Sequence, residues 1–118
     1  MNFNQLIIMT FDDPSLPEWL DASLVENFDS LPFGVVKMDY DGTVLYYNEP
    51  QSNLSGVSRE NAISKHFFTM VAPCTNNFMV SEKYKAQQLD EILPYMFTCI
   101  TKPTKVELRL IKGNRGNQ

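Results

Sequence analysis

The chain has 118 residues, of which 43% are hydrophobic, and this length suits a single domain with one core. Its net charge of −4 argues against general nucleic-acid binding, which requires a basic surface. No apolar run approaches the roughly 20 residues that a membrane-spanning helix needs, and the start lacks the positive segment of a signal peptide, so we expect a cytoplasmic protein.

The first half of the chain predicts a helix followed by a β-hairpin. After an irregular start, apolar residues within 19–28 recur at spacings that suit one helical stripe. Residues 35–39 and 43–47 then favour strands, and the pair Asp41-Gly42 between them is a strong hairpin signal.

The middle of the chain predicts helices with identifiable N-caps. Asn48 and Ser58 each precede a short stretch that favours a helix. Asn76 or Asn77 caps a longer predicted helix that runs through Leu89.

The last part of the chain predicts two strands and a polar tail. One strand spans 96–100, and the second alternates apolar residues at Val106, Leu108 and Leu110. We expect the tail, 113–118, to be disordered. Strands on both sides of a helical middle predict an α+β domain with an antiparallel sheet.

The two cysteines, Cys74 and Cys99, are too few for a disulfide-rich secreted scaffold. We interpret Cys99 as a small buried hydrophobic residue. The only histidine is His66, and no His/Cys cluster has metal-ligand spacing. A thiol enzyme or redox sensor built on Cys74 would need a nearby base or a resolving cysteine, and His66 is the one candidate base that the sequence offers.

Four segments together resemble the photoactive yellow protein family, bacterial photoreceptors with the PAS fold. They are Leu31-Pro32-Phe33-Gly34, the block around Tyr47-Asn48, Phe67-Phe68 with Val71-Ala72-Pro73-Cys74-Thr75, and Pro103-Thr104-Lys105-Val106. The resemblance runs from about Leu31 to about Leu110, which is most of the chain. The register of the Val-Ala-Pro-Cys-Thr run with the upstream Tyr-Asn makes it specific.

The resemblance implies a PAS-like α+β domain with a central antiparallel sheet and helices on one face. It places an N-terminal helical cap at 1–30, the PAS core at 31–112 and the tail at 113–118. The family closes its sheet with a further strand after the equivalent of Lys112, which this tail cannot supply. A truncated chain, a strand from a partner and a less stable domain remain open explanations. We therefore expect an incomplete sheet edge at which dimerisation or strand exchange is possible.

The resemblance also implies a covalent pigment, 4-hydroxycinnamic acid (p-coumaric acid), bound as a thioester to Cys74. A cysteine reacts as its thiolate, so an accessible thiol is required. The pigment's phenol would be held as a buried phenolate by Tyr47 and Gln51, with Ser55 as a supporting hydroxyl. The remaining implied contacts are Phe67, Pro73 and Thr101.

Three positions depart from the best-known family members. Gln51 stands where they carry glutamic acid, and its amide can donate a hydrogen bond but cannot release a proton, so we expect absorption to the red of theirs. Val57 replaces an arginine that covers the pocket. Thr101 replaces a methionine that touches the chromophore, and we expect slow dark recovery.

We therefore predict a blue-light photoreceptor, not an enzyme, that signals to an unidentified partner. Trans–cis isomerisation would loosen the N-terminal helix, a local event that biases a two-state element. The alternative is a PAS-like interaction module without pigment. Phe67 is equally consistent with core packing and with contact to the pigment. Taken alone, Tyr47 would be interpreted as a half-buried tyrosine at a strand end, and Gln51 as a surface amide. Their joint register with Cys74 favours the photoreceptor.

Overall fold

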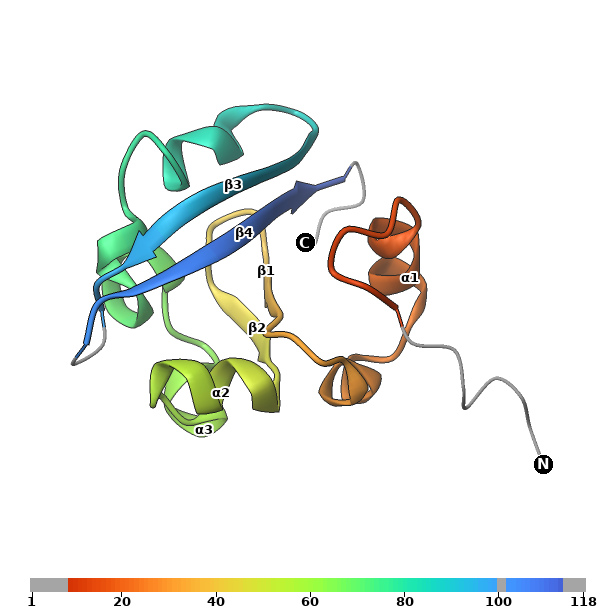
Figure 1. Ribbon diagram of the computed structural model, residues 1–118, viewed down its shortest axis with the longest axis horizontal. Helices are drawn as coiled ribbons and strands as arrows, with labels where there is room; N and C mark the ends of the chain where they lie inside the picture. The colour runs from red at the N-terminus through yellow and green to blue at the C-terminus, as the bar shows by residue number, and fades with distance from the viewer. Residues whose placement is uncertain (1–8, 100–101, 114–118) are drawn as a thin grey trace.

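A computed structural model describes residues 9–99 and 102–113 (Figure 1). Its strands are β1 (Val36–Met38), β2 (Val44–Tyr47), β3 (Leu89–Phe97) and β4 (Thr104–Lys112), and its α-helices are α1 (Leu16–Ala22), α2 (Glu49–Ser55) and α3 (Arg59–Ala62). The 3-10 helices are η2 (Val25–Ser30), η4 (Pro73–Thr75) and η5 (Ser81–Lys85), and a π-helical turn lies at η3 (Phe67–Val71). None of the described helices is both long and apolar enough to cross a membrane.

The described strands form two separate antiparallel hairpins within this α+β arrangement. β1 pairs with β2, and β3 pairs with β4 along its whole length, from Leu89 opposite Lys112 to Phe97 opposite Thr104. No described strand bridges β1 and β4, so the expected central sheet is divided at that place. Figure 1 shows α2 and α3 together beneath the hairpins, with α1 on the right.

The predicted β1–β2 hairpin is confirmed, and its turn explains why. The Asp39 carboxylate accepts hydrogen bonds from the backbone N–H groups of Asp41 and Thr43, at 2.9 and 3.0 Å. Gly42 has φ = 90°, a conformation that costs little without a Cβ. A side chain that bonds its own turn and a glycine with positive φ together set the hairpin locally.

Both predicted N-caps are confirmed. The Asn48 side chain accepts a hydrogen bond from the Gln51 N–H and starts α2, which ends at Gly56 in the left-handed conformation. The Ser58 side chain accepts from the Asn61 N–H and starts α3. These caps place α2 and α3 directly after β2.

The prediction of one helix over 19–28 is wrong. α1 ends at Ala22, Ser23 and Leu24 are extended, and η2 follows. Leu24, expected on the buried stripe, is 67% exposed. Phe28 instead packs against Trp19 and Tyr46, with ring centroids 6.1 and 5.9 Å away. This long-range aromatic packing overrides the local periodicity.

The longer helix predicted to run through Leu89 is also wrong. The Asn77 side chain does cap a turn, since its Oδ1 accepts from the N–H groups of Met79 and Val80, but only the short η5 follows. Leu89 begins β3, which ends at Phe97, whereas we predicted a strand over 96–100. β3 contains a proline that sequence reasoning treats as a breaker, yet an edge strand tolerates it. Residues 114–118, predicted to be disordered, lie outside the described part of the chain.

Asp29 ties η2 to the segment that carries the predicted site. Its Oδ2 accepts a hydrogen bond from the Tyr46 hydroxyl at 2.6 Å, and its Oδ1 accepts from the Glu49 N–H at 2.8 Å and from Arg59 Nη2 at 2.6 Å. Burial raises the pKa of Asp29, but the bonds from Tyr46 and Glu49 and the charge of Arg59 outweigh burial and hold the pKa below 3.8.

We expect Asp29 to make the fold sensitive to acid. Its pKa is lower in the folded than in the unfolded chain, so its stabilisation is present above about pH 4 and is lost as pH falls through the folded value. Asp29→Asn should cost about 1–2 kcal/mol at pH 7 and flatten the acid limb of the stability profile. Urea unfolding between pH 3 and pH 7 measures both effects. Asp41→Asn, at an exposed turn position, is the control, and an equal change there would contradict the assignment.

Candidate functional site

Tyr47 and Ser55 meet as a hydroxyl pair. Tyr47 ends β2 and is 1% exposed, and Ser55 ends α2. The Tyr47 hydroxyl lies 2.7 Å from Ser55 Oγ, and either group can be the donor. The cap at Asn48 starts the helix immediately after the strand, so the chain returns Ser55 to Tyr47. The strand and the helix thus bring these two predicted site residues into contact.

Gln51 is positioned by packing. Its backbone N–H is held by Asn48, and its side chain lies so close to Gly34 that a Cβ at position 34 would collide with it. Among the described residues, the Gln51 side-chain amide has no hydrogen-bond partner. The structure therefore does not join Gln51 directly to Tyr47, and it leaves the amide free to donate.

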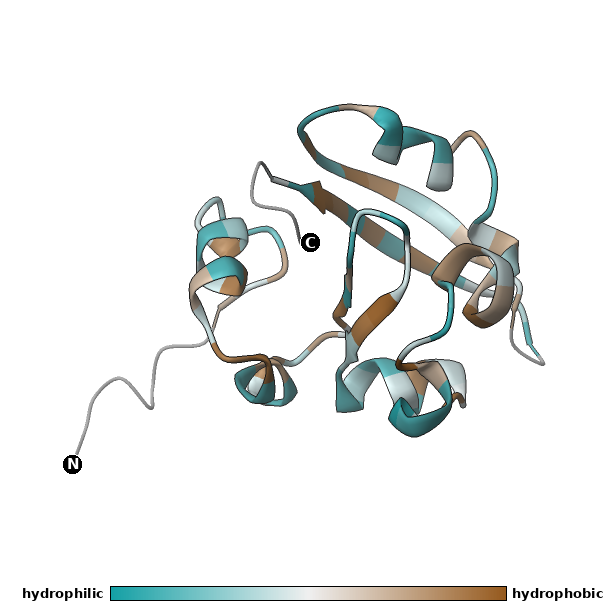
Figure 2. Cartoon of the chain, turned by 180° about the vertical axis from the view of Figure 1, so that it is seen from behind, coloured by the Kyte–Doolittle hydropathy of each residue, from teal (hydrophilic) through white to brown (hydrophobic). Residues whose placement is uncertain are grey.

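Both hairpins line a cleft of about 620 Å³, and Met38 of β1 and Leu110 of β4 also belong to one buried cluster. Its walls include the β1 residues Val36 and Met38 and the β4 residues Val106, Leu108 and Leu110. Gln51 and Phe67, both predicted site residues, also line it. Figure 2 shows hydrophobic residues along the strands of both hairpins and hydrophilic ones on the outlying turns. A cleft of this size and apolar character suits a small organic molecule.

Phe67 and Val57 belong to the packing around Tyr47. Val44, Tyr47 and Ala62 form a buried cluster, and Phe67 and Val57 pack against it. Because Phe67 also borders the cleft, it both packs in the core and is placed to contact a molecule in the cleft. The predicted tyrosine, serine and phenylalanine thus lie in or against one cluster.

Cys74 and Cys99 form a disulfide, with their Cα atoms 5.6 Å apart. Cys99 is exposed, so its interpretation as a buried hydrophobic residue is wrong. It is instead the partner cysteine that sequence reasoning did not find for Cys74. The pairing depends on the position of the β3–β4 hairpin, which the 25-residue separation of the two cysteines does not reveal.

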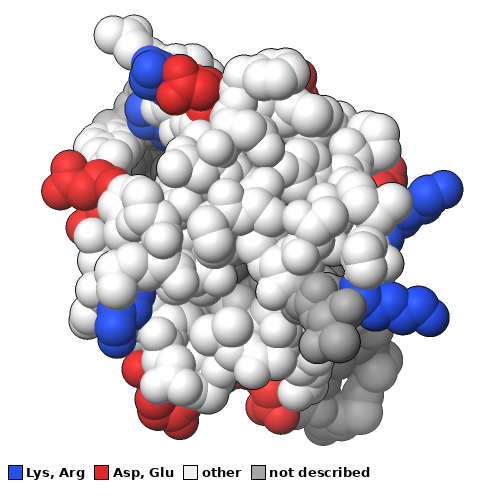
Figure 3. Space-filling view, turned by 90° about the vertical axis from the view of Figure 1, so that its left-hand side faces the viewer, with Lys and Arg blue, Asp and Glu red and all other residues white. Residues whose placement is uncertain are grey.

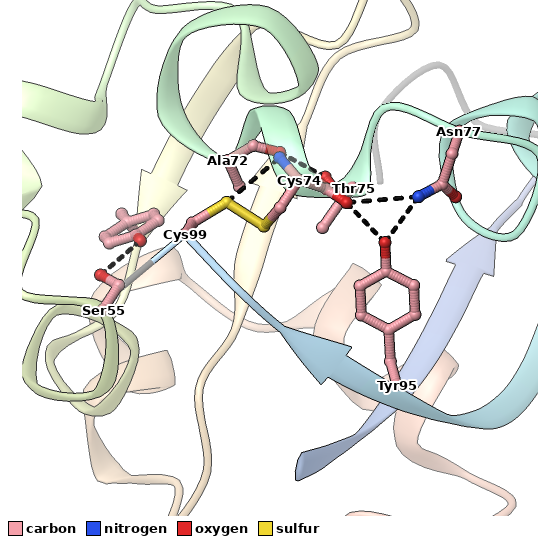
Figure 4. The surroundings of a disulfide bond; sticks show 8 residues. Ser55, Ala72, Cys74, Thr75, Asn77, Tyr95 and Cys99 are labelled. Atoms are coloured by element: carbon pink, nitrogen blue, oxygen red, sulfur yellow. Dashed lines mark hydrogen bonds between the residues drawn. A yellow bond between two sulfur atoms is a disulfide. The ribbon is translucent and has the colours of Figure 1, made fainter. Parts of the chain in front are cut away.

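The turn that carries Cys74 is held by its own hydrogen bonds (Figure 4). The Tyr95 hydroxyl donates to the Cys74 carbonyl oxygen at 2.5 Å, and Asn77 Nδ2 donates to the Tyr95 hydroxyl at 2.6 Å and to the Cys74 carbonyl at 3.2 Å. Thr75 Oγ1 donates to the Ala72 carbonyl at 2.7 Å. Sequence reasoning gave Tyr95 no role and named Asn77 only as a cap. Tyr95 occupies one of the alternate positions of β3 that face inward. This pattern could have identified it in the sequence only if the start of the strand had been known.

Two predicted contacts remain without a demonstrated role. Pro73 begins η4 and is exposed, so it shapes the turn before Cys74. Thr101 lies outside the described residues.

The segment that carries Cys74 also presents apolar surface. Met70 is 62% and Phe78 is 77% exposed. Figure 3 shows the side of the molecule on which this segment lies, and the charged residues there are found mainly at the rim. Exposed methionine and aromatic side chains on a weakly charged surface are typical of protein contacts.

Comparison with known proteins gives consistent relatives, although no family model matches the sequence. The photoactive yellow protein of Rhodothalassium salexigens is 31% identical over 93 residues, which are 75% of this chain and 74% of that protein. The photoactive yellow protein of Halochromatium salexigens is 32% identical over 92 residues, with the same coverage of both chains.

A solved structure supports the same relationship. The photoactive yellow protein domain from the sensor histidine kinase Ppr of Rhodospirillum centenum superposes with a TM-score of 0.77 at 30% identity. The match covers 86% of this chain and 94% of that domain. It confirms the α+β, PAS-like fold predicted from the sequence.

Proposed function

Because the chain belongs to the photoactive yellow protein family, we propose that it is a blue-light photoreceptor that carries p-coumaric acid as a thioester on Cys74. The observation that carries this proposal is the hydroxyl pair of buried Tyr47 and half-buried Ser55, with Phe67 packed against the cluster of Tyr47. A buried anion needs hydrogen-bond donors in an apolar setting, and this pair provides them. Bound p-coumaric acid supplies the light absorption and a double bond that isomerises from trans to cis.

The Tyr47–Ser55 pair is suited to hold a phenolate. When Ser55 donates to the Tyr47 oxygen, the Tyr47 proton is free to be donated to an anion, and each bond strengthens the other. Gln51 adds an amide N–H from the cleft side. Donors aimed at the charged form of a phenol lower its pKa.

Gln51 limits what the site does after light absorption. Its amide stabilises the phenolate but has no proton to give up, so the proton must come from solvent or from another group. The neighbouring cleft offers solvent a route to this position. We therefore propose absorption to the red of members with glutamic acid there, and slow dark recovery because Thr101 replaces methionine.

The N-terminal helices are the proposed moving element. Tyr46, which precedes Tyr47, contacts Phe28 and hydrogen-bonds to Asp29 of η2. A rearrangement at Tyr47 is therefore one residue away from the contacts that hold η2. Docked terminal segments open at a lower free-energy cost than the core, so loss of these contacts would release the N-terminal helices.

The proposed partner is a signalling protein in the cytoplasm. The similar domain from Rhodospirillum centenum comes from a sensor histidine kinase, and exposed Met70 and Phe78 here offer apolar contacts to another protein. The cleft between β1 and β4 gives a second copy of the chain a place to pair by strand exchange or dimerisation.

Loading with pigment tests the proposal. Reduced protein is mixed with activated p-coumaric acid, and its visible spectrum and intact mass are recorded. We expect a yellow protein whose mass gain disappears completely in Cys74→Ala and persists in the control Cys99→Ala. A folded protein that stays colourless and unmodified would refute the photoreceptor and leave the pigment-free interaction module.

A further inference from the structure

The disulfide joins two segments that other contacts already hold together (Figure 4). Cys74 lies in η4, and Cys99 follows shortly after the end of β3. The Tyr95 hydroxyl of β3 bonds to the Cys74 carbonyl oxygen, and Asn77 bonds to both oxygens. None of these bonds involves a sulfur atom, so they hold the turn of Cys74 against β3, the strand that ends at Phe97, whether the disulfide is closed or open.

The exposure of Cys99 favours reversibility. With the bond closed, the Cα separation of 5.6 Å lies in the usual range for disulfides. Cys99 is exposed, and small thiols or disulfides can therefore reach the pair. In the cytoplasm proposed for this protein, disulfides that form are usually transient or redox-sensing.

Cys74 has a single sulfur atom, and two bonds compete for it. A thiolate is the species that becomes acylated, and a disulfide sulfur has no thiolate to offer. We propose that the Cys74–Cys99 disulfide is a reversible thiol switch that decides whether Cys74 can be modified. The identity of the acyl group in this inference rests on the proposed function. The pairing of the two sulfur atoms is observed in the structure.

Both reactions balance with ordinary reagents. Oxidised glutathione is attacked by the Cys99 thiolate, which releases one glutathione thiolate; the Cys74 thiolate then attacks the Cys99 sulfur and releases the second. Two protein thiols are oxidised and one small disulfide is reduced. In the reduced protein, the Cys74 thiolate instead attacks the carbonyl carbon of an activated p-coumaroyl thioester, and the small thiol leaves. Acylated Cys74 can no longer pair with Cys99.

The test compares the full chain in two redox states. Protein is treated with oxidised glutathione or with dithiothreitol, freed of small molecules, and offered activated p-coumaroyl thioester. Intact mass distinguishes the internal disulfide from added glutathione, and a thiol titration counts free cysteines. We expect the oxidised protein to load at least ten-fold less pigment than the reduced protein, and dithiothreitol to restore loading.

Cys99→Ser is the matched variant. It removes the partner sulfur and keeps Cys74, so the fraction free of glutathione should load equally after both treatments. Oxidised wild-type protein that keeps two free thiols would overturn the inference. Equal loading of wild-type protein with a verified internal disulfide would overturn it as well.

A second probe separates this inference from the proposed function. N-ethylmaleimide labels free thiols, and peptide mapping shows whether it reaches Cys74. Labelling of Cys74 only after reduction supports the switch even if no state takes up pigment, a result that would refute the photoreceptor alone. Labelling of Cys74 in both states would overturn the switch.

Discussion

Asn48→Ala is expected to destabilise the protein by about 3–5 kcal/mol, the largest loss of stability that we predict for a single side chain. Asn48 is 0% exposed and uses all of its hydrogen-bonding groups. Its Nδ2 donates to the carbonyl oxygens of Phe28 and Phe33, at 2.8 and 3.0 Å. Its Oδ1 accepts from the N–H groups of Val35 and Gln51, at 2.7 and 3.1 Å.

The cost arises because alanine leaves four backbone groups without the partner that the fold supplies. Asn48→Asp separates the acceptor role of the side chain from its donor role. It keeps the acceptor oxygen and the cap but points a carboxylate at two carbonyl oxygens. We expect it to be as damaging as alanine. Denaturant unfolding at neutral pH under constant redox conditions measures the losses.

Asn61 provides the control for this prediction. It is an exposed asparagine in α3, so Asn61→Ala should change the stability by less than about 0.5 kcal/mol. A loss below about 1 kcal/mol for Asn48→Ala would show that water replaces the missing bonds, and the assignment of Asn48 as the anchor of α2 would then be wrong.

Tyr47→Phe, made in pigmented protein, is expected to raise the pKa of the pigment phenol by about 1–2 units. A hydrogen bond to a charged group contributes about 1.5–3 kcal/mol, and one pKa unit corresponds to about 1.4 kcal/mol. Tyr47 donates to the charged form of the pigment in the proposed site, so its loss favours the protonated form. The visible band should then appear only at higher pH, which a pH titration of the absorption spectrum measures.

The neighbouring tyrosine supplies a matched control. The Tyr46 hydroxyl donates to Asp29 instead, and burial together with that bond raises the pKa of Tyr46 to about 12. Tyr46→Phe should therefore weaken the contact with η2 and leave the titration of the pigment unchanged. An equal shift in both variants would place the phenol away from Tyr47.

Local signals explain the parts of the fold that sequence reasoning predicted. The hairpin turn at Asp41-Gly42 and the two helix caps, at Asn48 and Ser58, depend on hydrogen bonds between residues no more than four positions apart. Their formation therefore depends little on the rest of the chain. The alternation in β4 is likewise local, and the strand was predicted at the right place.

The wrong predictions of secondary structure occur where contacts between distant residues decide which element forms. Phe28 packs on Tyr46 and breaks the helix predicted over 19–28. β3 starts at Leu89 because β4 offers a partner along all nine residues, although Pro94 argues against a strand when it is considered alone.

The residue types of the proposed site and the spacing between Tyr47 and Cys74 follow from the sequence, because a family motif is a pattern of residues along the chain. Capping also placed Ser55 against Tyr47 without reference to distant parts. The pairing of Cys74 with Cys99 follows from the three-dimensional fold, because that contact depends on where the β3–β4 hairpin lies. The cleft between the hairpins likewise depends on the assembled fold, in which β1 and β4 do not pair.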